Sequence, residues 1–133
     1  MSKFKYHHDG TQPHEGEIFV FGSNLSGWHG AGAAKAAKLH YGAIVGIGVG
    51  FTGQSYAIPT KNYLVESMPL DDIKPFIKQF VHVTNSQQHL QFFVTRVGCG
   101  LAGFDDLEIA PLFANCNPEN CSMPNTWQLY LEN

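Results

Sequence analysis

The sequence predicts an α/β fold in which a mixed, largely parallel central sheet is covered by helices on both faces. Apolar segments of strand length alternate with segments of helical periodicity, which is typical of parallel strands joined by crossover helices. Glycine-rich loops follow the apolar segments, and 133 residues are enough for one hydrophobic core. We therefore expect a single domain over residues 1–133, with a ligand site where the carboxyl ends of the strands meet.

The composition narrows the class of partner. Apolar residues make up 44% of the chain, charged residues 14%, and the net charge is −3, so the chain should fold and should not bind an extended nucleic acid. The three cysteines are an odd number, and the polar start of the sequence is no signal peptide. No apolar run is long enough to span a membrane. These features predict a cytoplasmic protein with reduced thiols and no membrane partner, but no particular oligomeric state.

Residues 1–16 are expected to form a flexible or peripheral arm before the first strand. The segment is polar, with turn signals at Asp9 and Pro13, and its histidines lack the spacing of a metal motif. We therefore predict no metal site. The first strand is expected over residues 17–21, where a continuous apolar run is typical of a strand covered on both faces.

A glycine-rich loop carries this strand into an alanine-rich helix, expected over residues 31–41 and ended by Gly42. Glycines let backbone N–H groups approach an anion, and the helix N-terminus adds a partial positive charge. The loop therefore predicts a nucleotide or phosphorylated-sugar site, with turning of the chain as the alternative role. The residues expected at the ligand are Gly22, Ser23, Asn24, Gly30, Ala31 and Gly32.

Two strands and a helix are expected in the middle of the chain. Residues 44–49 and 55–58 are apolar on either side of a second glycine-rich loop, and the second of these strands ends near Lys61. Residues 70–84 carry apolar side chains at spacings of three and four, which predicts a helix. Pro75 is tolerated only in the first turn, so we expect this helix to begin near residue 71 or 72.

The last third of the chain should supply another buried strand and a third glycine-rich loop. The strand is expected over residues 90–97, the loop over 98–104, a short helix restarted at Pro111 over 106–114, and a final strand over 127–131. Backbone N–H groups of the third loop could bind a diphosphate. Because all three loops follow strands, they can share one rim of the sheet.

Two of these loops resemble the ligand loops of macrodomains, the fold that binds ADP-ribose. Gly22-Ser23-Asn24-Leu25 through Gly30-Ala31-Gly32-Ala33-Ala34 resembles the first, and Val97-Gly98-Cys99-Gly100-Leu101-Ala102-Gly103-Phe104 the second. The resemblance runs from about Glu17 to Ala114. It implies a three-layer α/β/α macrodomain-like fold, ADP-ribose or an ADP-ribosylated macromolecule as partner, and no cofactor. The second loop would contribute Gly98, Cys99, Gly100, Leu101, Ala102, Gly103 and Phe104 to the site.

A narrower resemblance concerns catalysis. Tyr56-Ala57-Ile58-Pro59-Thr60-Lys61 is similar to the strand ending in Thr-Lys of lysine-dependent ADP-ribosyl glycohydrolases. That branch includes the terminal ADP-ribose glycohydrolase and the antitoxin that removes ADP-ribose from DNA bases. Arg96-Val97-Gly98-Cys99-Gly100-Leu101 resembles a run of the former enzyme, in which the next residue is a catalytic aspartate. Here that residue is Ala102, and Asp105 or Asp106 would be the substitutes.

Each candidate residue has a functional and a structural interpretation. Lys61 could form a Schiff base with C1 of a ribose, or remain a solvated lysine that pairs with an anion. Asn24 could bind the distal ribose through its amide or serve turn geometry. His29 could act as a general acid or base, or have a structural role. In macrodomains an acidic residue after the first strand often binds the adenine amino group, and Asp9, Glu15 and Glu17 are the candidates here.

These observations predict a protein that binds ADP-ribose and hydrolyses an ADP-ribosyl bond on protein or nucleic acid, with Lys61 and His29 as catalytic residues. The alternative is a non-catalytic binder or sponge of ADP-ribose or a derived nucleotide signal, which the alanine at position 102 favours. A third possibility is a hydrolase of a phosphorylated ribose metabolite, in which His29 would matter more than Lys61.

Overall fold

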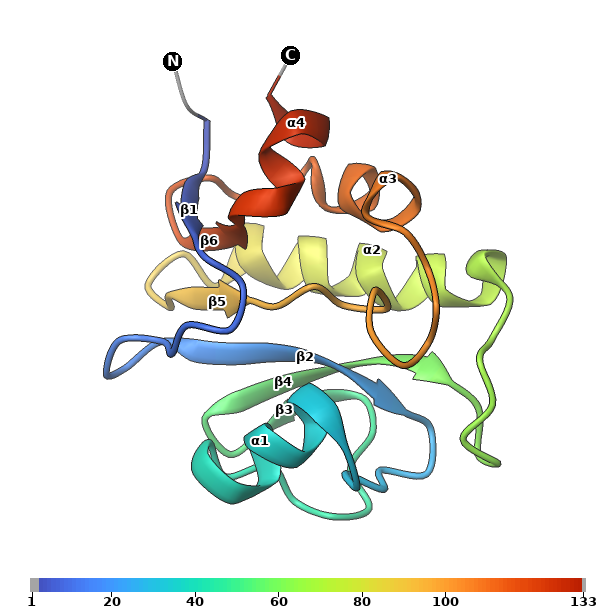
Figure 1. The fold of residues 1–133 in the computed structure, drawn as a ribbon. Coiled ribbons are helices and arrows are strands. Elements are labelled where there is room, and N and C mark those ends of the chain that lie inside the picture. Colours follow the sequence, from blue (N-terminus) through green and yellow to red (C-terminus); the bar gives the residue numbers. More distant parts are fainter. Residues whose placement is uncertain (1–2, 133) are drawn as a thin grey trace.

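A computed structural model describes residues 3–132 and confirms the predicted fold class. Its centre is a six-stranded sheet in the order β1-β6-β5-β2-β4-β3 (Figure 1). Every neighbouring pair is parallel except β3 and β4, which are antiparallel. The strands are β1 (Lys5–His7), β2 (Ile18–Asn24), β3 (Gly50–Thr52), β4 (Ser55–Lys61), β5 (Phe92–Val94) and β6 (Cys121–Pro124).

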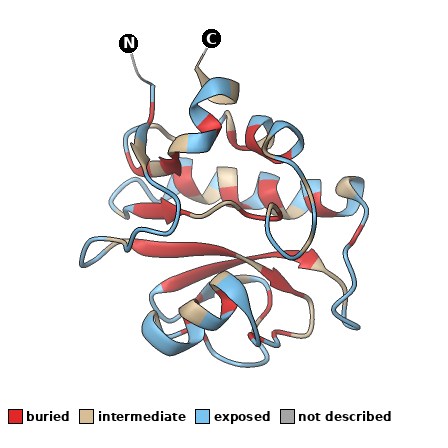
Figure 2. Ribbon diagram, in the orientation of Figure 1, coloured by how far each residue is buried: buried red, intermediate tan, exposed pale blue. Residues whose placement is uncertain are grey.

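Helices cover both faces of the sheet, so the molecule has three layers (Figure 1). One face carries α1 (Gly32–His40), whose alanines pack on the phenylalanines of β2 and β5. The larger core lies on the opposite face, and Figure 2 shows that the central strands between the two layers are buried. The elements on that face are α2 (Leu70–Ser86), α3 (Asp106–Ile109), the 3-10 turns η1 (Ala110–Phe113) and η2 (Asn125–Trp127), and α4 (Gln128–Leu131).

The local sequence explains why β2 and α1 form where they do. Residues 18–21 are buried, because a central strand with helices on both faces must be apolar on both sides. The small side chains of Ala34 and Ala37 let α1 lie close to the sheet. Gly42, with a φ of 75°, follows the helix at a position where L-residues with a Cβ are disfavoured.

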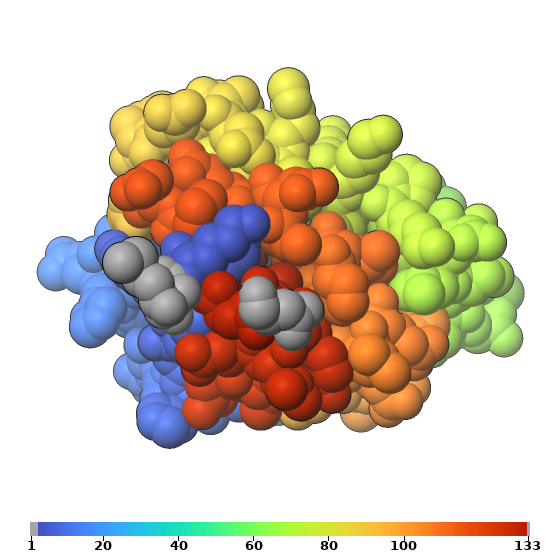
Figure 3. Space-filling model, turned by 90° about the horizontal axis from the view of Figure 1, so that it is seen from above, coloured from blue at the N-terminus to red at the C-terminus, as the bar shows by residue number. Residues whose placement is uncertain are grey.

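Part of the expected N-terminal arm belongs to the sheet. Residues 5–7 form the edge strand β1, which pairs with β6 in parallel register. The backbone N–H groups of Lys3 and Phe4 donate to the carboxylate of Glu132, so the two ends of the described chain meet. Figure 3 shows the N-terminal segment (blue) against the C-terminal segment (red) on this face of the molecule.

Two expected strands are absent from the described structure. Residues 44–49 are an irregular loop, because Gly46 has a φ of 98° and Gly48 packs directly under the backbone of Asn24. Residues 127–131 continue η2 into α4 instead of forming a strand. The strand of that region is β6, and it ends at Pro124, which cannot donate a ladder hydrogen bond.

The long helix begins slightly earlier than expected. α2 starts at Leu70, so Pro75 lies in its second turn and offers no N–H to the carbonyl of Asp71. The restart at Pro111 agrees with the sequence expectation, since α3 passes into η1 there.

Candidate functional site

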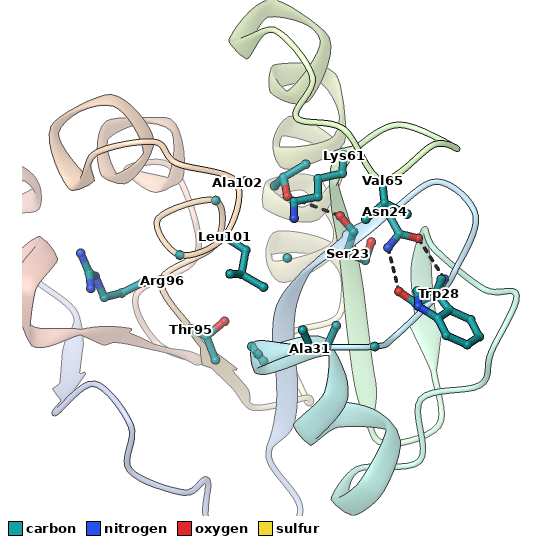
Figure 4. Close-up of a pocket in the computed structure, with 18 residues that line it drawn as sticks. Ser23, Asn24, Trp28, Ala31, Lys61, Val65, Thr95, Arg96, Leu101 and Ala102 are labelled. Carbon is teal, nitrogen blue, oxygen red and sulfur yellow. Dashed lines mark hydrogen bonds between the residues drawn. The ribbon is translucent and has the colours of Figure 1, made fainter.

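Two adjoining cavities lie beside the central strands, and the first of them is at the carboxyl ends of these strands. The first has a volume of about 480 Å³ and extends between the ends of β2 and β4, the start of α1 and the loop after β5 (Figure 4). The second, of about 440 Å³, lies between α1, the sheet and residues 9–12. The walls that the two cavities share are formed by Gly32, Ala33, Thr95, Arg96 and Gly100. The two cavities therefore adjoin, and together they are called the trough below.

Most of the predicted site residues line this trough. The first cavity is lined by Gly22, Ser23, Asn24, Gly30, Ala31, Gly32, Lys61, Gly98, Gly100, Leu101 and Ala102, and the second by Cys99. His29, Gly103 and Phe104 line neither cavity. Phe104 packs against the larger core.

Asn24 organises the loop between β2 and α1. Its Nδ2 donates to the carbonyl of Trp28 at 2.7 Å. Its Oδ1 accepts from the hydroxyl of Ser26 at 2.7 Å and from the backbone N–H of Trp28 at 2.9 Å. The second N–H of Nδ2 is therefore the donor left for a ligand, and the amide oxygen is already in use.

His29 lies behind the loop instead of in the cavity. Its side chain is 1% exposed, its Nε2 donates to the carbonyl of Ile44 at 3.1 Å, and its ring meets the ring of Phe21 edge-on. Its Nδ1 is buried without a hydrogen-bond partner among residues 3–132. These contacts favour the structural role for His29 over the role of general acid or base.

The second glycine-rich segment supports the first loop from behind. The hydroxyl of Ser23 donates to the carbonyl of Gly48, and a Cβ on Gly48 would lie 2.0 Å from the carbonyl oxygen of Asn24. Neither cavity is lined by residues 44–54. This segment therefore shapes the site without contributing to its surface, contrary to the expectation that all three loops share the rim.

Lys61 is the last residue of β4 and lines the first cavity. Its backbone carbonyl accepts from the N–H of Leu25, which ties the strand to the loop after β2. Its ammonium has no hydrogen-bond or ion-pair partner among residues 3–132. The lysine thus presents an unpaired amine to the cavity.

A strained turn follows Lys61 and contributes to the same wall. Val65 has a φ of 62°, which is rare for a β-branched residue, and it lines the first cavity. The side chain of Asn62 holds the turn by accepting from the N–H groups of Leu64 and Glu66. The hydroxyl of Ser67 donates to the carbonyl of Ala102 at 2.8 Å, which joins this turn to the loop after β5.

The loop after β5 approaches the trough through its glycines. Gly98 has a φ of 76°, and a Cβ at this position would lie 3.3 Å from the side chain of Ile109. Both the backbone conformation and the limited space therefore favour glycine here. A Cβ on Gly100 would meet no atom within 4 Å, because this residue opens onto both cavities. Burial, together with the neighbouring Asp106, raises the pKa of the Cys99 thiol to about 12, so this thiol is a poor nucleophile at neutral pH.

Neither aspartate downstream of Ala102 takes the place of a catalytic acid in the cavity. Asp105 forms the capping box of α3 with Glu108. Asp106 accepts from Nε and Nη2 of Arg96, both at 3.0 Å, and from the indole N–H of Trp127 at 2.8 Å. Asp and Glu are absent from the residues that line the first cavity.

These contacts fix the ionisation of the Arg96–Asp106 pair. Burial alone would raise the pKa of the Asp106 carboxyl, but hydrogen bonds from Arg96 and Trp127 outweigh it and hold the pKa below its ordinary value. The hydrogen bond with Asp106 in turn raises the pKa of Arg96. Both groups are therefore charged across the neutral range.

Asp9 is the acidic candidate that reaches the trough. It lines the second cavity, and its Oδ2 lies 3.6 Å from Nη1 of Arg96. Glu15 and Glu17 line neither cavity. Sequence reasoning missed Arg96 as a site residue, although its place between β5 and the third glycine-rich loop was a usable signal.

Two further properties of the described residues concern metal binding and membrane crossing. No group of three or more His, Cys, Asp and Glu side chains within residues 3–132 could hold a metal ion. In the same part of the chain, no helix has both the length and the apolar character to cross a membrane.

The three-layer fold is that of a macrodomain. The structure superimposes on the macrodomain of Mycobacterium tuberculosis DarG with a TM-score of 0.68 and 20% sequence identity, covering 93% of this chain and 99% of that chain. No protein-family model and no curated protein sequence matches the chain. At this identity the likeness establishes the macrodomain fold.

Proposed function

We propose that this chain binds ADP-ribose in the trough and hydrolyses an ADP-ribosyl bond with Lys61 as the nucleophile. The observation that carries the proposal is the unpaired ammonium of Lys61 on the wall of a cavity that also presents Asn24 and glycine N–H groups. The similarity of fold to a macrodomain supports ADP-ribose as the ligand.

ADP-ribose would bind with its distal ribose in the first cavity and its adenosine in the second. The distal ribose belongs beside Asn24 and Lys61, and the diphosphate lies over the start of α1 and beside Gly100, where the two cavities meet. Backbone N–H groups and the positive end of α1 stabilise the diphosphate there. The adenosine then reaches the second cavity, where Asp9 accepts a hydrogen bond from the adenine amino group.

The chemistry proposed for Lys61 needs no group beyond the lysine and water. In its unprotonated form, the amine attacks C1 of the distal ribose and forms a C–N bond. The attached group leaves with the electron pair of the broken bond and takes a proton from the amine. Opening of the ribose ring gives a Schiff base at C1, and water hydrolyses it to release ADP-ribose and restore the free lysine.

One observation favours a second candidate, a non-catalytic binder of ADP-ribose. The first cavity has no carboxylate on its wall, because position 102 is alanine and the carboxylates of Asp105 and Asp106 are engaged elsewhere. A poor leaving group there would receive its proton from the lysine amine alone, without a carboxylic acid to assist its departure.

The test has two stages, binding and covalent trapping. Calorimetric titration should give micromolar or tighter affinity for ADP-ribose and much weaker affinity for AMP and ribose 5-phosphate. Incubation with ADP-ribose and cyanoborohydride should then reduce the Schiff base and leave a stable adduct on Lys61, identified by peptide mass spectrometry.

Variants separate the two candidates. Lys61→Ala should lose the adduct and the turnover of ADP-ribosylated protein or oligonucleotide but keep ADP-ribose affinity within about threefold, since one partly exposed ammonium adds little to binding. Lys38→Ala, on α1 and outside both cavities, is the matched control. Tight binding without adduct or turnover would leave the non-catalytic binder, and absence of binding would reject both.

A further inference from the structure

Arg96 is held rigidly from one side and open on the other. Its Nε and Nη2 each donate to Asp106 at 3.0 Å, and Asp106 is itself fixed by the indole of Trp127. A guanidinium has five N–H donors, so this bidentate contact leaves three of them free. In Figure 4 the side chain of Arg96 points away from Lys61, and it lines the second cavity.

The free side of Arg96 faces a carboxylate. Nη1 of Arg96 lies 3.6 Å from Oδ2 of Asp9, and both side chains remain partly exposed, at 33% and 51% respectively. Donor and acceptor thus stand side by side on the wall of the second cavity. A pair so exposed contributes little to stability by itself, which makes both groups available to a ligand.

The rest of the second cavity is suited to a flat heterocycle. His7 stacks on Phe93 with ring centroids 3.8 Å apart, and Phe19 stacks on Tyr41 at 4.4 Å. All four residues line the cavity, but Phe19 and Phe93 are buried, so His7 and Tyr41 are the partly exposed rings that a ligand could contact. An aromatic wall with a neighbouring donor and acceptor is the arrangement that binds a nucleobase through its face and its edge.

One donor and one acceptor side by side are complementary to one edge of adenine. The exocyclic amine of adenine is a donor, and the ring nitrogens beside it are acceptors. Hypoxanthine and guanine carry a carbonyl oxygen in place of that amine, which would face the Asp9 carboxylate with a second acceptor. We infer that Arg96 is a specificity-determining residue that donates to a ring nitrogen of adenine while Asp9 accepts from the adjacent amine. The inference rests on the proposed binding of ADP-ribose.

Ligand analogues test this on the unmodified protein. The probes are ADP-ribose, its 7-deaza and 1-deaza analogues, which each replace one ring nitrogen beside the amine by C–H, and inosine diphosphate ribose. We expect one deaza analogue to bind about tenfold more weakly than ADP-ribose, because a hydrogen bond from a charged donor is lost. Inosine diphosphate ribose should bind more weakly still.

Variants assign the lost hydrogen bond to Arg96. In Arg96→Met, ADP-ribose and the sensitive deaza analogue should bind equally, while Arg96→Lys should restore part of the difference. The methionine leaves Asp106 without its cation, so Arg96→Met combined with Asp106→Asn provides a second background that keeps an acceptor for Trp127. Thermal melts show which variants are folded.

Three results would overturn the inference. Both deaza analogues could bind as tightly as ADP-ribose, which would mean that no ring nitrogen beside the amine is contacted. The deficit could persist unchanged in Arg96→Met, which would assign the nitrogen to another donor. If ADP-ribose itself does not bind, the proposed function fails and this inference with it. The first two results leave ADP-ribose binding intact and so reject only the role of Arg96.

Discussion

The trough presents two cations that differ in how they are held. Lys61 is the last residue of β4, so its backbone is held by the sheet. Its ammonium lines the first cavity and has no hydrogen-bond or ion-pair partner among residues 3–132. Arg96 is anchored by two 3.0 Å hydrogen bonds to Asp106 and faces Asp9 as well. An unpaired amine can change its protonation state and form a bond, whereas an anchored guanidinium stays charged and aimed. Under the proposed function, the two cations would serve different tasks, with Lys61 in the reaction and Arg96 in recognition of the ligand.

The largest predicted effect is a loss of ADP-ribose affinity on substitution of a residue that lines both cavities. Gly100 lines both cavities, lacks a positive φ, and has open space where a Cβ would lie, so Gly100→Glu should leave the fold intact. The new carboxylate would oppose the diphosphate, and ADP-ribose affinity should fall by about a hundredfold or more. Calorimetry measures the loss.

The matched control for this variant is Leu129→Glu, which adds the same charge at an exposed position of α4. It should bind ADP-ribose as the unmodified protein does. Unchanged affinity in Gly100→Glu would mean that the ligand does not pass Gly100. The proposal that one ligand contacts both Lys61 and Arg96 would then be rejected.

A smaller effect is expected when the anchor of Arg96 is weakened. The side chain of Asp106 is only 17% exposed, and Asp106→Asn should lower the free energy of unfolding by about 2 kcal/mol, as charged hydrogen bonds are replaced by neutral ones. Urea denaturation at neutral pH measures it. Loss of the anchor should also remove the preference for the ring nitrogen while the Lys61 adduct still forms.

The same variant has a defined pH dependence. Folding lowers the pKa of Asp106 below its ordinary value of 3.8, so this carboxylate stabilises the fold above that pH. The contribution is lost as the pH falls through the lowered folded-state pKa. The difference in unfolding free energy between the unmodified protein and Asp106→Asn should therefore be full above about pH 4 and shrink below it. A difference that stays constant down to pH 2 would contradict the assignment.

The smallest predicted effect concerns the wall beside Lys61. Val65 combines a φ of 62° with 41% exposure, and asparagine tolerates that conformation better than a β-branched residue. Val65→Asn should raise the free energy of unfolding by about 1 kcal/mol, measured by urea denaturation. Val49→Asn, at a similar exposure of 38% and without a positive φ, should show no such gain.

The parts of the fold that local sequence patterns determine could be predicted. The apolar run of β2, the small residues of α1 and the three-and-four spacing of α2 each specify their element within the chain segment itself. The same holds for the cavity positions of Lys61, Gly22 and Gly98, because these residues lie in or directly after the ends of strands.

The missed parts depend on contacts between distant segments. β1 is short, and residues 5–7 carry no strong strand pattern of their own. They form a strand by pairing with β6, which comes from the other end of the chain. Asp9 comes two residues after β1, so the position of this strand brings Asp9 close to Arg96. His29 is the converse case, since its position in a glycine-rich loop carries no sign of the burial of its side chain, which is 1% exposed.

The hydrogen bond from Ser67 to Ala102 has an evolutionary consequence. Its acceptor is the main-chain carbonyl of residue 102, so the link between the turn after Lys61 and the loop after β5 survives any substitution of that side chain that keeps the backbone in place. The side chain at position 102 faces the first cavity while its backbone belongs to the scaffold. An acid could therefore be gained or lost at this position during evolution without a change in the walls of the cavity. The binding site and the chemistry performed in it could then evolve separately.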